Sequence, residues 1–400
     1  MVFIEPFSLL LQTLIEFNQM KASIFIAGAG GIGQAVALII SEYNIFQADI
    51  IFGDVSQKAL DDAIYFVKEG TSHPVQVSGL LMDKGGDYQS MIPTLEKCDV
   101  LLDCLPGSLA PKMAALAKQC NCHYANLTEY VSETNQIKNI AEGADTAFVL
   151  QTGLAPGFIN VLACKLYEQY REKYGNDMLE EMTMKVGALP QNACHPHYYA
   201  FTWSPIGVAT EYLKNAVIVD NYKQTEVAAL SDTESLIING DRFEDNYTSG
   251  GAANLPEAFS GKIKKLHYKT LRQPGHYQWV KRQLETIPEG LDKISTLEKM
   301  MLENIPSVEN DMVVIYASVE GFDLTGRRRK IEKAYKILPV VIGKRALRAI
   351  QTTTAAPMCE MAYMMLNKKW KGLIQQSDVP TSEFLNGPFV ARIYGSFEDY

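Results

Sequence analysis

The sequence predicts an α/β protein, in which an N-terminal domain built on a doubly wound parallel sheet precedes an α+β domain. Strand-like and helix-like segments alternate from Ser23 to Thr152, which is typical of a parallel sheet with helices on both faces. A glycine-rich turn joins the first strand to the first helix, where the chain needs a tight connection. After Thr152 the alternation stops, and this change indicates a second domain of a different kind.

The first domain contains six strand-like segments rich in apolar residues. They are residues 23–28, 48–54, 75–81, 98–105, 122–127 and 146–152. Helical spacing occurs between them at residues 32–43, 57–69, 87–96, 108–119 and 133–142. Six strands connected in this way make two mononucleotide-binding halves, which predicts the strand order 3-2-1-4-5-6.

The segment GAGGIG, residues 28–33, lies between the first strand and the first helix and matches the dinucleotide-binding fingerprint of Rossmann domains. Its first glycine permits a tight turn, its second lets a pyrophosphate approach the backbone, and its last lets the helix pack on the strand. The phosphates would lie at the helix N-terminus, where free N–H groups and the helix dipole favour anions. The residues expected to contact a cofactor here are Gly28, Gly30, Gly31, Ile32 and Gly33.

Asp54 ends the second strand, about twenty residues after the last glycine of the turn. A carboxylate at this place can accept hydrogen bonds from both ribose hydroxyls and would repel a 2′-phosphate. Val55, Ser56 and Gln57 follow it, and no arginine comes soon after. The sequence therefore predicts NAD as the cofactor in preference to NADP.

Two further segments follow the fourth and fifth strands, beyond the point where the strand order reverses. In doubly wound sheets, the nicotinamide and the substrate meet in that crevice. Leu105 and Pro106 come at the end of the fourth strand, and we expect them to contact the cofactor, although Pro106 could equally start the next helix. Glu129 follows the fifth strand and is a candidate catalytic carboxylate, with a surface loop charge as the alternative.

The second half begins with a Pro-Gly turn and one long amphipathic helix within residues 153–175. Strand-like runs follow at residues 180–189, 216–220, 262–272, 311–323 and 327–338. Helical stretches such as 206–215 and 276–285 interrupt these runs, which predicts a mixed or antiparallel sheet packed on helices. From Gly343 the chain is helical again, and its methionine stripe is more typical of core packing than of a ligand site.

Composition restricts the class of protein. The chain has 400 residues and a net charge of -9. A nucleic-acid-binding protein needs a basic face, so we expect no nucleic acid as a partner. Seven cysteines without a CxxC pair argue against a disulfide framework in so long a chain, so we expect a reducing cytoplasm. The N-terminus lacks the positive start of a secretory signal and no apolar run reaches about 18 residues, so we expect no membrane contact.

Several stretches together resemble the saccharopine dehydrogenase family, most closely the branch of the L-lysine 6-dehydrogenases and saccharopine reductases. They are GLAPGFINVLA, GALPQ, YAFTWSPIGVATEYL, TSGGAANLPEAF, YKTLRQPGH and AIQTTTAAP. The resemblance extends from about Lys21 to Pro388, in the family's motif order. Ala155 stands where the saccharopine reductases have Asp, and Gln273 stands where the lysine branch usually has Tyr. A related amine or imino acid therefore stays open as the substrate.

The resemblance implies an NAD-binding Rossmann domain at residues 20–152 and 343–400, with C-terminal helices that return to it. It implies a substrate-binding and dimerisation domain at residues 153–342, and residues 1–19 are left as an extension. The expected protein is a homodimeric NAD-dependent oxidoreductase that acts on the C–N bond of a small amino acid. Two alternatives stay open: a carboxyspermidine-type reductase that forms a C–N bond with NAD(P)H, and a non-catalytic NAD-binding sensor or scaffold.

The segment HYKTLRQPGHYQW, residues 267–279, gathers basic and protonatable groups in an acidic chain. Alternation along a strand would put Tyr268, Thr270 and Arg272 on one face, and a Pro-Gly turn would carry His276 toward it. The planar fork of Arg272 could bind a substrate carboxylate, and His276 could accept the proton of a substrate amine. The alternatives are that Arg272 pairs with a structural carboxylate and that His276 caps the following helix.

Ser204 and Tyr199 are lesser candidates for substrate binding, because they lie in the family's substrate-domain motif. Cys194, His195 and His197 have side chains that bind metals, but Pro196 interrupts them and no fourth ligand is evident. We therefore predict no metal site.

Overall fold

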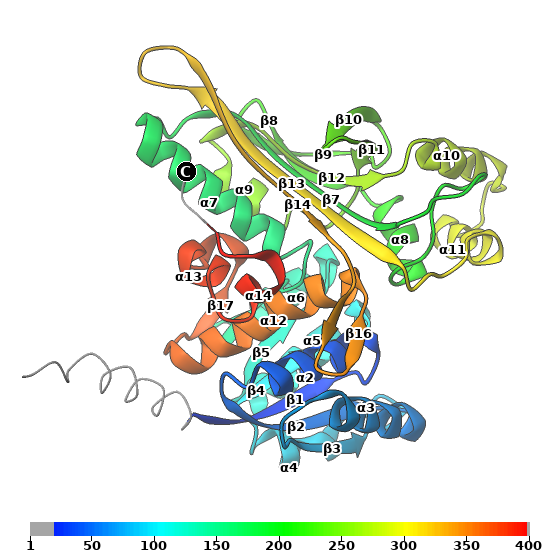
Figure 1. Ribbon diagram of the computed structural model, residues 1–400, viewed down its shortest axis with the longest axis vertical. Coiled ribbons are helices and arrows are strands. Elements are labelled where there is room, and N and C mark those ends of the chain that lie inside the picture. The colour runs from blue at the N-terminus through cyan, green and yellow to red at the C-terminus, as the bar shows by residue number, and fades with distance from the viewer. Residues whose placement is uncertain (1–19, 398–400) are drawn as a thin grey trace, which may run out of the picture.

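The computed structural model describes residues 20–397, which build two sheets that lie in the lower and the upper half of Figure 1. The predicted N-terminal extension, residues 1–19, lies outside the described residues. The domain boundaries that the sequence suggests at residues 152 and 343 stay a proposal.

The first sheet is parallel and seven-stranded, in the order β17-β6-β5-β4-β1-β2-β3. Its strands are β1 (Lys21–Ala27), β2 (Gln47–Asp54), β3 (Gln76–Leu81), β4 (Val100–Asp103), β5 (His123–Asn126), β6 (Ala147–Val149) and β17 (Gly372–Ile374). The first six have the predicted order, so the doubly wound arrangement is confirmed. The sequence did not predict β17, which adds a parallel strand beside β6.

Helices cover both faces of this sheet (Figure 1). They are α2 (Gly31–Tyr43), α3 (Gln57–Gly70), α4 (Ile92–Leu95), α5 (Ala110–Gln119) and α6 (Val131–Ala141), with the short 3-10 turns η1 (Gln89–Met91) and η2 (Gly107–Leu109). Strand β4 is buried along its whole length, as a parallel strand covered on both faces requires. The helix expected at residues 87–96 is reduced to η1 and the short α4. Proline is tolerated in the first turn of a helix but not in its interior, so a helix that contains Pro93 has to begin beside it.

The second sheet has eight strands. They are β7 (Leu179–Pro190), β8 (Ala216–Asp220), β9 (Lys223–Val227), β10 (Glu234–Ile238), β11 (Asp241–Tyr247), β12 (Ile263–Arg272), β13 (Asp311–Phe322) and β14 (Arg328–Ile337). The accompanying helices are α7 (Phe158–Tyr174), α8 (Pro205–Glu211), α9 (Leu255–Phe259), α10 (His276–Thr286) and α11 (Lys293–Asn304). Strand β7 pairs in parallel with β12 and antiparallel with β13, so the predicted mixed sheet is confirmed.

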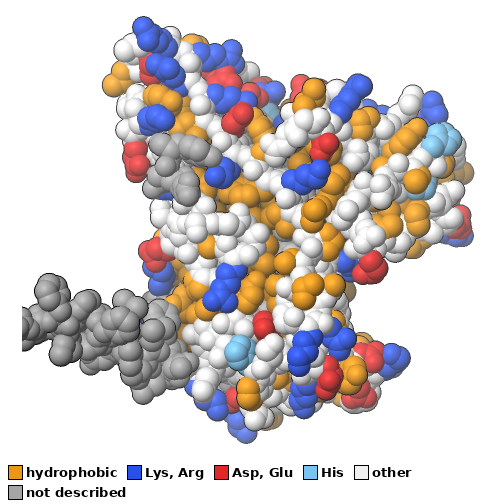
Figure 2. Space-filling model, in the orientation of Figure 1, with side chains coloured by type: hydrophobic (Ala, Val, Ile, Leu, Met, Phe, Trp, Pro, Cys, Tyr) orange, Lys and Arg blue, Asp and Glu red, His pale blue; other side chains and the backbone are white. Residues whose placement is uncertain are grey.

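The hairpin of β13 and β14 projects from this sheet (Figure 1), and its tip carries the basic run that begins at Arg327. Arg328 pairs with Glu320 across the hairpin, and Nε of Arg329 lies 2.8 Å from a carboxylate oxygen of Asp323. Figure 2 shows positive and negative side chains interspersed over this face of the molecule. The basic run is therefore a solvated strand end with acidic partners.

The C-terminal segment returns to the first sheet, as the resemblance implies. After the hairpin of β15 (Val340–Ile342) and β16 (Arg345–Leu347), α12 (Ala349–Asn367) packs on both α2 and β13. The segment ends with β17, η3 (Gln376–Asp378), α13 (Thr381–Leu385) and α14 (Val390–Tyr394). Met358 and Met361 of α12 are fully buried, which confirms their role in core packing.

One continuous apolar cluster connects the two sheets. It extends from β1 through α2 and α12 to α7, β7 and β13. This cluster holds the second sheet over the carboxyl ends of the first, where a doubly wound sheet binds its ligands. Within residues 20–397, no helix combines the length and the apolar character that crossing a bilayer needs.

Candidate active site

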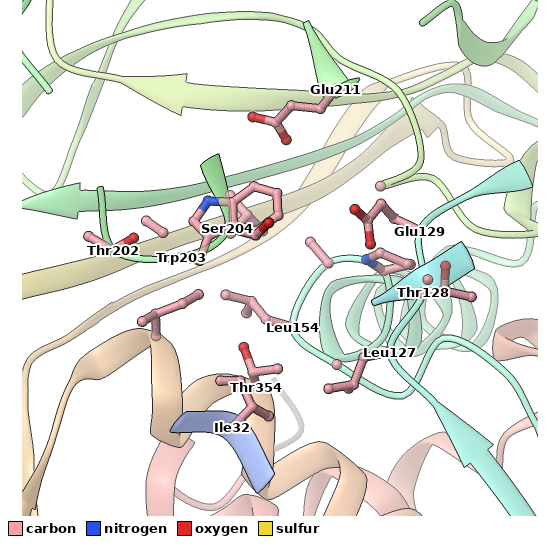
Figure 3. A pocket seen from close by; sticks show the side chains of 18 of the residues that line it. Ile32, Leu127, Thr128, Glu129, Leu154, Thr202, Trp203, Ser204, Glu211 and Thr354 are labelled. Atoms are coloured by element: carbon pink, nitrogen blue, oxygen red, sulfur yellow. The ribbon is translucent and has the colours of Figure 1, made fainter. Parts of the chain in front are cut away.

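A cavity of about 480 Å³ lies between the two sheets. Its walls come from the start of α2, the loops after β4 and β5, the turn at residues 153–156, strands β7 and β12, the segment around α8, and the start of α12. Figure 3 shows the side chains of Ile32 and Thr354 entering from one side and those of Trp203 and Glu211 from the other. The cavity therefore joins the crevice of the first sheet to the second sheet.

Glycine is needed at the three fingerprint positions 28, 30 and 33 for different physical reasons. Gly28 has φ +101°, and a Cβ atom on it would lie 2.9 Å from the carbonyl oxygen of Cys104. A Cβ atom on Gly33 would lie 2.1 Å from the carbonyl oxygen of Gly28, so the helix could not approach the strand. A Cβ atom on Gly30 would meet no described atom within 4 Å. Gly28 and Gly33 thus serve the fold, whereas Gly30 keeps open space beside the helix start.

The N-terminus of α2 fits an anion. Among the described residues, no side chain caps this helix, whose N-cap is Gly30. Its first N–H groups can therefore bind an external acceptor, and the helix dipole favours a negative one. Gly31 and Ile32, in the first turn, line the cavity. The uncapped helix and the open space at Gly30 fit the diphosphate of a dinucleotide.

Asp54 lies beside the glycine turn. One of its carboxylate oxygens accepts a hydrogen bond of 3.0 Å from the backbone N–H of Ala29, and the other accepts one of 2.9 Å from Ser56. These bonds hold the carboxylate at the end of β2, where the ribose of a dinucleotide would bind. Asp54, Gly28, Gly30 and Gly33 do not line the cavity itself but lie next to its α2 side.

The loops after β4 and β5 meet at the wall of the cavity. Leu105 and Pro106 line it, and Pro106 also precedes the short turn η2. Glu129 lines the cavity from the second loop, half-buried rather than on an open surface. Burial raises the pKa of Glu129, and the charge of Glu133 adds a smaller rise.

Strand β12 presents the face that its alternation predicts. Tyr268, Thr270 and Arg272 line the cavity. On the opposite face, Nζ of Lys269 lies 2.9 Å from a carboxylate oxygen of Asp232, away from the cavity. The two faces of the strand thus direct Arg272 toward the cavity and Lys269 into an ion-pair network.

Arg272 is 1% exposed, and three hydrogen bonds fix its guanidinium. Nη2 donates to Oε1 of Glu211 at 2.6 Å, Nε donates to the hydroxyl of Tyr212 at 2.6 Å, and Nη1 donates to the carbonyl of Leu271 at 3.0 Å. The ring of Tyr199 stacks on it, with its centroid 4.8 Å from Cζ. Arg272 therefore pairs with a buried carboxylate, which was the alternative to a role in substrate binding. It also forms part of the cavity wall.

Glu211 is the cavity residue that sequence reasoning missed beside Arg272. Burial raises the pKa of Glu211 to about 7, although the guanidinium of Arg272 acts in the opposite direction. Glu211 ends α8, inside the stretch YAFTWSPIGVATEYL. Only its place in that stretch could have marked Glu211 as a cavity residue, because a glutamate at a helix end is usually a surface charge.

His276 lies behind Arg272 and does not line the cavity. Its Nδ1 is 2.7 Å from the carbonyl of His197, and its Nε2 is 3.0 Å from the hydroxyl of Tyr212. A carbonyl only accepts, so Nδ1 carries the proton and Nε2 accepts from Tyr212. Burial, and then the charge of Arg272, lowers the pKa of His276 to about 3.

The structure brings some of the other predicted residues to the cavity and not all. Ser204 lines it and is exposed, but its hydroxyl also accepts a hydrogen bond of 3.3 Å from the backbone N–H of Gly207 and so caps α8. Tyr199 is buried against Arg272 and does not reach the cavity. Arg348, which the sequence analysis did not single out, lines the cavity at the start of α12.

Comparisons with known proteins agree with this architecture. Residues 24–151 match the family described as saccharopine dehydrogenase NADP binding domain, and residues 153–393 match the saccharopine dehydrogenase C-terminal domain. The alpha-aminoadipic semialdehyde synthase of Arabidopsis thaliana is 24% identical over 200 residues, 47% of this chain and 18% of that protein. The mitochondrial enzyme of that name from Bos taurus is 27% identical over 130 residues, 31% of this chain and 14% of that protein. The matched segments thus span less than a fifth of these relatives.

Two solved structures share the fold. Saccharopine dehydrogenase (L-Glu forming) from Saccharomyces cerevisiae has a TM-score of 0.72 at 15% identity, covering 93% of this chain and 98% of that chain. The homospermidine synthase of Legionella pneumophila in complex with NAD has a TM-score of 0.63 at 12% identity, covering 96% and 93%. The two family matches cover almost the whole described chain in order, and the protein belongs to the saccharopine dehydrogenase family of oxidoreductases.

Proposed function

We propose that the protein is an NAD-dependent dehydrogenase that acts on the C–N bond of an amino acid or imino acid, lysine or a close relative. The observation that carries this proposal is the cavity itself, which joins the N-terminus of α2 to the buried guanidinium of Arg272. Family membership supports C–N chemistry, and the relatives named alpha-aminoadipic semialdehyde synthase support a substrate related to lysine.

Arg272 is the proposed anchor for the substrate carboxylate. A guanidinium offers five N–H groups, and the three bonds to Glu211, Tyr212 and Leu271 leave donors for a ligand in the cavity. Because these bonds fix the plane of the guanidinium before substrate arrives, little rotational freedom is lost on binding. The hydroxyl of Ser204 adds a second polar contact on the same wall.

Glu129 is the proposed base. A substrate ammonium group must lose a proton before a hydride can leave the adjacent carbon, and the raised pKa of Glu129 suits a carboxylate to that task. His276 is proposed as a positioning residue instead, since it is neutral and accepts from Tyr212, which in turn holds Arg272. When bound, the nicotinamide accepts the hydride.

NAD is the proposed dinucleotide, held by the glycine turn, Leu105, Pro106 and Asp54. The carboxylate of Asp54 would oppose a 2′-phosphate, and the nearest following cation, Lys58, pairs with Asp62. The family that matches residues 24–151 is described as NADP binding, and NADP is therefore the competing cofactor. Calorimetric titration of the protein with both reduced cofactors measures the affinity for each, and tighter binding of NADPH would overturn this part of the proposal.

The same site could run in the opposite direction, as a reductase that forms a C–N bond. Glu129 and Glu211 place two carboxyl groups in the cavity beside the guanidinium of Arg272, and either could bind the amine of a second substrate. The direction of the reaction, assembly as a homodimer and a cytoplasmic location all stay predictions.

Single-turnover absorbance of the reduced nicotinamide tests the proposal in both directions. Excess protein is mixed with NAD and a panel of amino acids, and separately with NADH, oxo acids and amines. We expect reduction of NAD with lysine or a related amino acid. A protein that binds the dinucleotide but shows no turnover with either panel would contradict the proposal and favour a non-catalytic sensor.

A further inference from the structure

Arg348 lies where the first turn of α2 opens into the cavity. Its Nη2 is 3.8 Å from the position that a Cβ atom on Gly31 would take, so the guanidinium lies over the start of the helix. The charged side chains that line the cavity are Glu129, Glu211, Arg272 and Arg348. Arg348 is the one of them on the α2 side.

The ion pair that Arg348 makes in the described part of the chain is a weak one, and its charge also acts on the buried carboxyl of Asp311, whose pKa burial raises and Arg348 lowers. Nε of Arg348 is 3.7 Å from a carboxylate oxygen of Glu309, whose side chain is 88% exposed. A pair this long with so exposed a carboxylate is screened by water. Arg272, by contrast, donates a 2.6 Å hydrogen bond to a buried carboxylate. Arg348 thus lines the cavity with three quarters of its side chain buried and without a short ion pair in the described part of the chain.

The backbone of Arg348 is fixed from two directions. Asp311, at the start of β13, caps α12 by accepting hydrogen bonds of 2.7 Å from the N–H of Ala349 and 2.8 Å from that of Ile350. The side chain of Gln351 accepts a 3.0 Å hydrogen bond from the N–H of Arg348 and donates one of 2.9 Å to the carbonyl of Gly31. The second sheet and the glycine turn therefore both hold the start of α12.

This contact explains the glycine at position 31, which has no positive φ to demand it. A Cβ atom there would lie 3.2 Å from Nε2 of Gln351, tighter than an ordinary contact. A side chain there would displace the amide of Gln351, which donates to the carbonyl of Gly31, and would crowd the guanidinium of Arg348. The absence of a side chain at Gly31 thus serves the approach of a cation as well as that of a ligand.

We propose that Arg348 binds the diphosphate of the dinucleotide, together with the N-terminus of α2. A helix N-terminus offers about half a positive charge, whereas a diphosphate carries two negative ones, so a guanidinium beside the helix supplies what the helix lacks. Gln351 and Asp311 are positioning residues for it. The proposal goes beyond the proposed function, because it holds for any substrate and for either dinucleotide.

Binding of two cofactor fragments to the full-length protein tests this proposal without turnover. ADP-ribose contains the diphosphate and adenosine does not, so we compare the calorimetric Kd of ADP-ribose with the Kd of adenosine from competition. Arg348→Ala should weaken ADP-ribose about 10- to 150-fold and leave adenosine within about twofold. In this variant the affinity for ADP-ribose should also fall less steeply as salt is added, because one charge contact has been removed.

Two further variants complete the experiment. Arg348→Lys keeps the charge without the fork and should bind ADP-ribose with intermediate affinity, which gives a readout even if Arg348→Ala folds poorly. Lys344→Ala removes the same charge at an exposed position four residues earlier and should bind as the unchanged protein does. Unchanged ADP-ribose affinity in both Arg348 variants would overturn the proposal, and so would an equal loss for adenosine.

Discussion

The Nη2 atom of Arg272 lies 2.6 Å from Oε1 of Glu211, and both side chains are buried in the cavity wall. A lone buried guanidinium would be costly, and the carboxylate, with Tyr212, offsets that cost while the site is empty. The pair also means that an incoming substrate carboxylate shares Arg272 with Glu211. The strength and the pH dependence of substrate binding therefore both depend on this pair.

Arg272→Lys should lower kcat/KM about 10- to 150-fold, since charge-assisted hydrogen bonds contribute about 1.5–3 kcal/mol each and lysine has no fork. The Kd of NAD should hardly change, because Arg272 lies on the second sheet. Steady-state kinetics and calorimetry measure the two quantities. Arg329→Lys, at a surface ion pair, is the matched control. A fall in NAD affinity equal to the fall in kcat/KM would make Arg272 a structural residue.

Alanine at position 272 is a poorer test. Arg272 is buried in an ion pair with Glu211, so it contributes to folding as well as to the cavity wall. Arg272→Ala would leave a buried carboxylate without its partner, which costs about 3–5 kcal/mol. Loss of activity in that variant would then mix binding with stability.

A carboxylate analogue of the substrate should bind more weakly as the pH rises through about 7. Below that pH, Glu211 holds its proton and leaves Arg272 to the ligand; above it, the ionised Glu211 competes. Glu211→Gln should flatten the dependence of this affinity on pH. Glu129→Gln measures how much the neighbouring carboxylate contributes to that dependence. Calorimetric titration between pH 5.5 and roughly 8.5 covers the range. Affinity that rises with pH would show that Glu211 does not compete with the ligand for Arg272.

The same ionisation affects stability, with a sign that follows from the direction of the shift. The folded state holds the proton of Glu211 to about pH 7, whereas its ordinary pKa is 4.5. Between these values the folded state binds more protons than the unfolded chain, so Glu211 makes the free energy of unfolding fall as pH rises.

Glu129→Gln should lower kcat about 100-fold or more and remove an ionisation from the pH profile of kcat, because general-base catalysis contributes about that much. His276→Asn should behave differently. It should raise KM by loosening Tyr212 and Arg272, and leave the pH profile unchanged, since the pKa of His276 is about 3. pH-rate profiles of both variants decide between them. Loss of the ionisation in His276→Asn alone would make His276 the base.

Gly30→Ala and Gly33→Ala should separate cofactor binding from folding. The backbone of Gly30 has φ -76° and its Cβ position is open, so alanine should fold normally while weakening NAD about 5- to 150-fold by crowding the ligand. Gly33→Ala places Cβ against the carbonyl of Gly28 and should lower Tm. Thermal unfolding and calorimetry measure both variants. Equal losses of Tm would show that Gly30 serves the backbone rather than the ligand.

The first sheet could be predicted closely because its strands are short apolar runs between helices of regular spacing. Strand β17 was missed, because three residues far along the chain join a sheet that is otherwise complete. Strands β9 and β10 were missed for another reason. They are short and largely exposed: β9 is polar apart from Val227, and only the last three residues of β10 are apolar.

The site could be predicted only in part. Alternation along β12 correctly placed Arg272 toward the cavity, because a strand fixes the direction of each side chain. It could not identify Glu211, which lies 61 residues earlier in the sequence and meets Arg272 only through the fold. Nor could it show that Tyr212 and His197 occupy both nitrogens of His276. Contacts between distant segments decide which polar residues reach the cavity.

A crystal structure of the protein with reduced cofactor and a bound substrate amino acid would show whether Arg272 holds the substrate carboxylate. We expect density for the substrate carboxylate within hydrogen-bond distance of Arg272, the amine beside Glu129, and the reacting carbon against the nicotinamide. A carboxylate bound well away from Arg272, with the ligand still against the nicotinamide, would contradict this expectation.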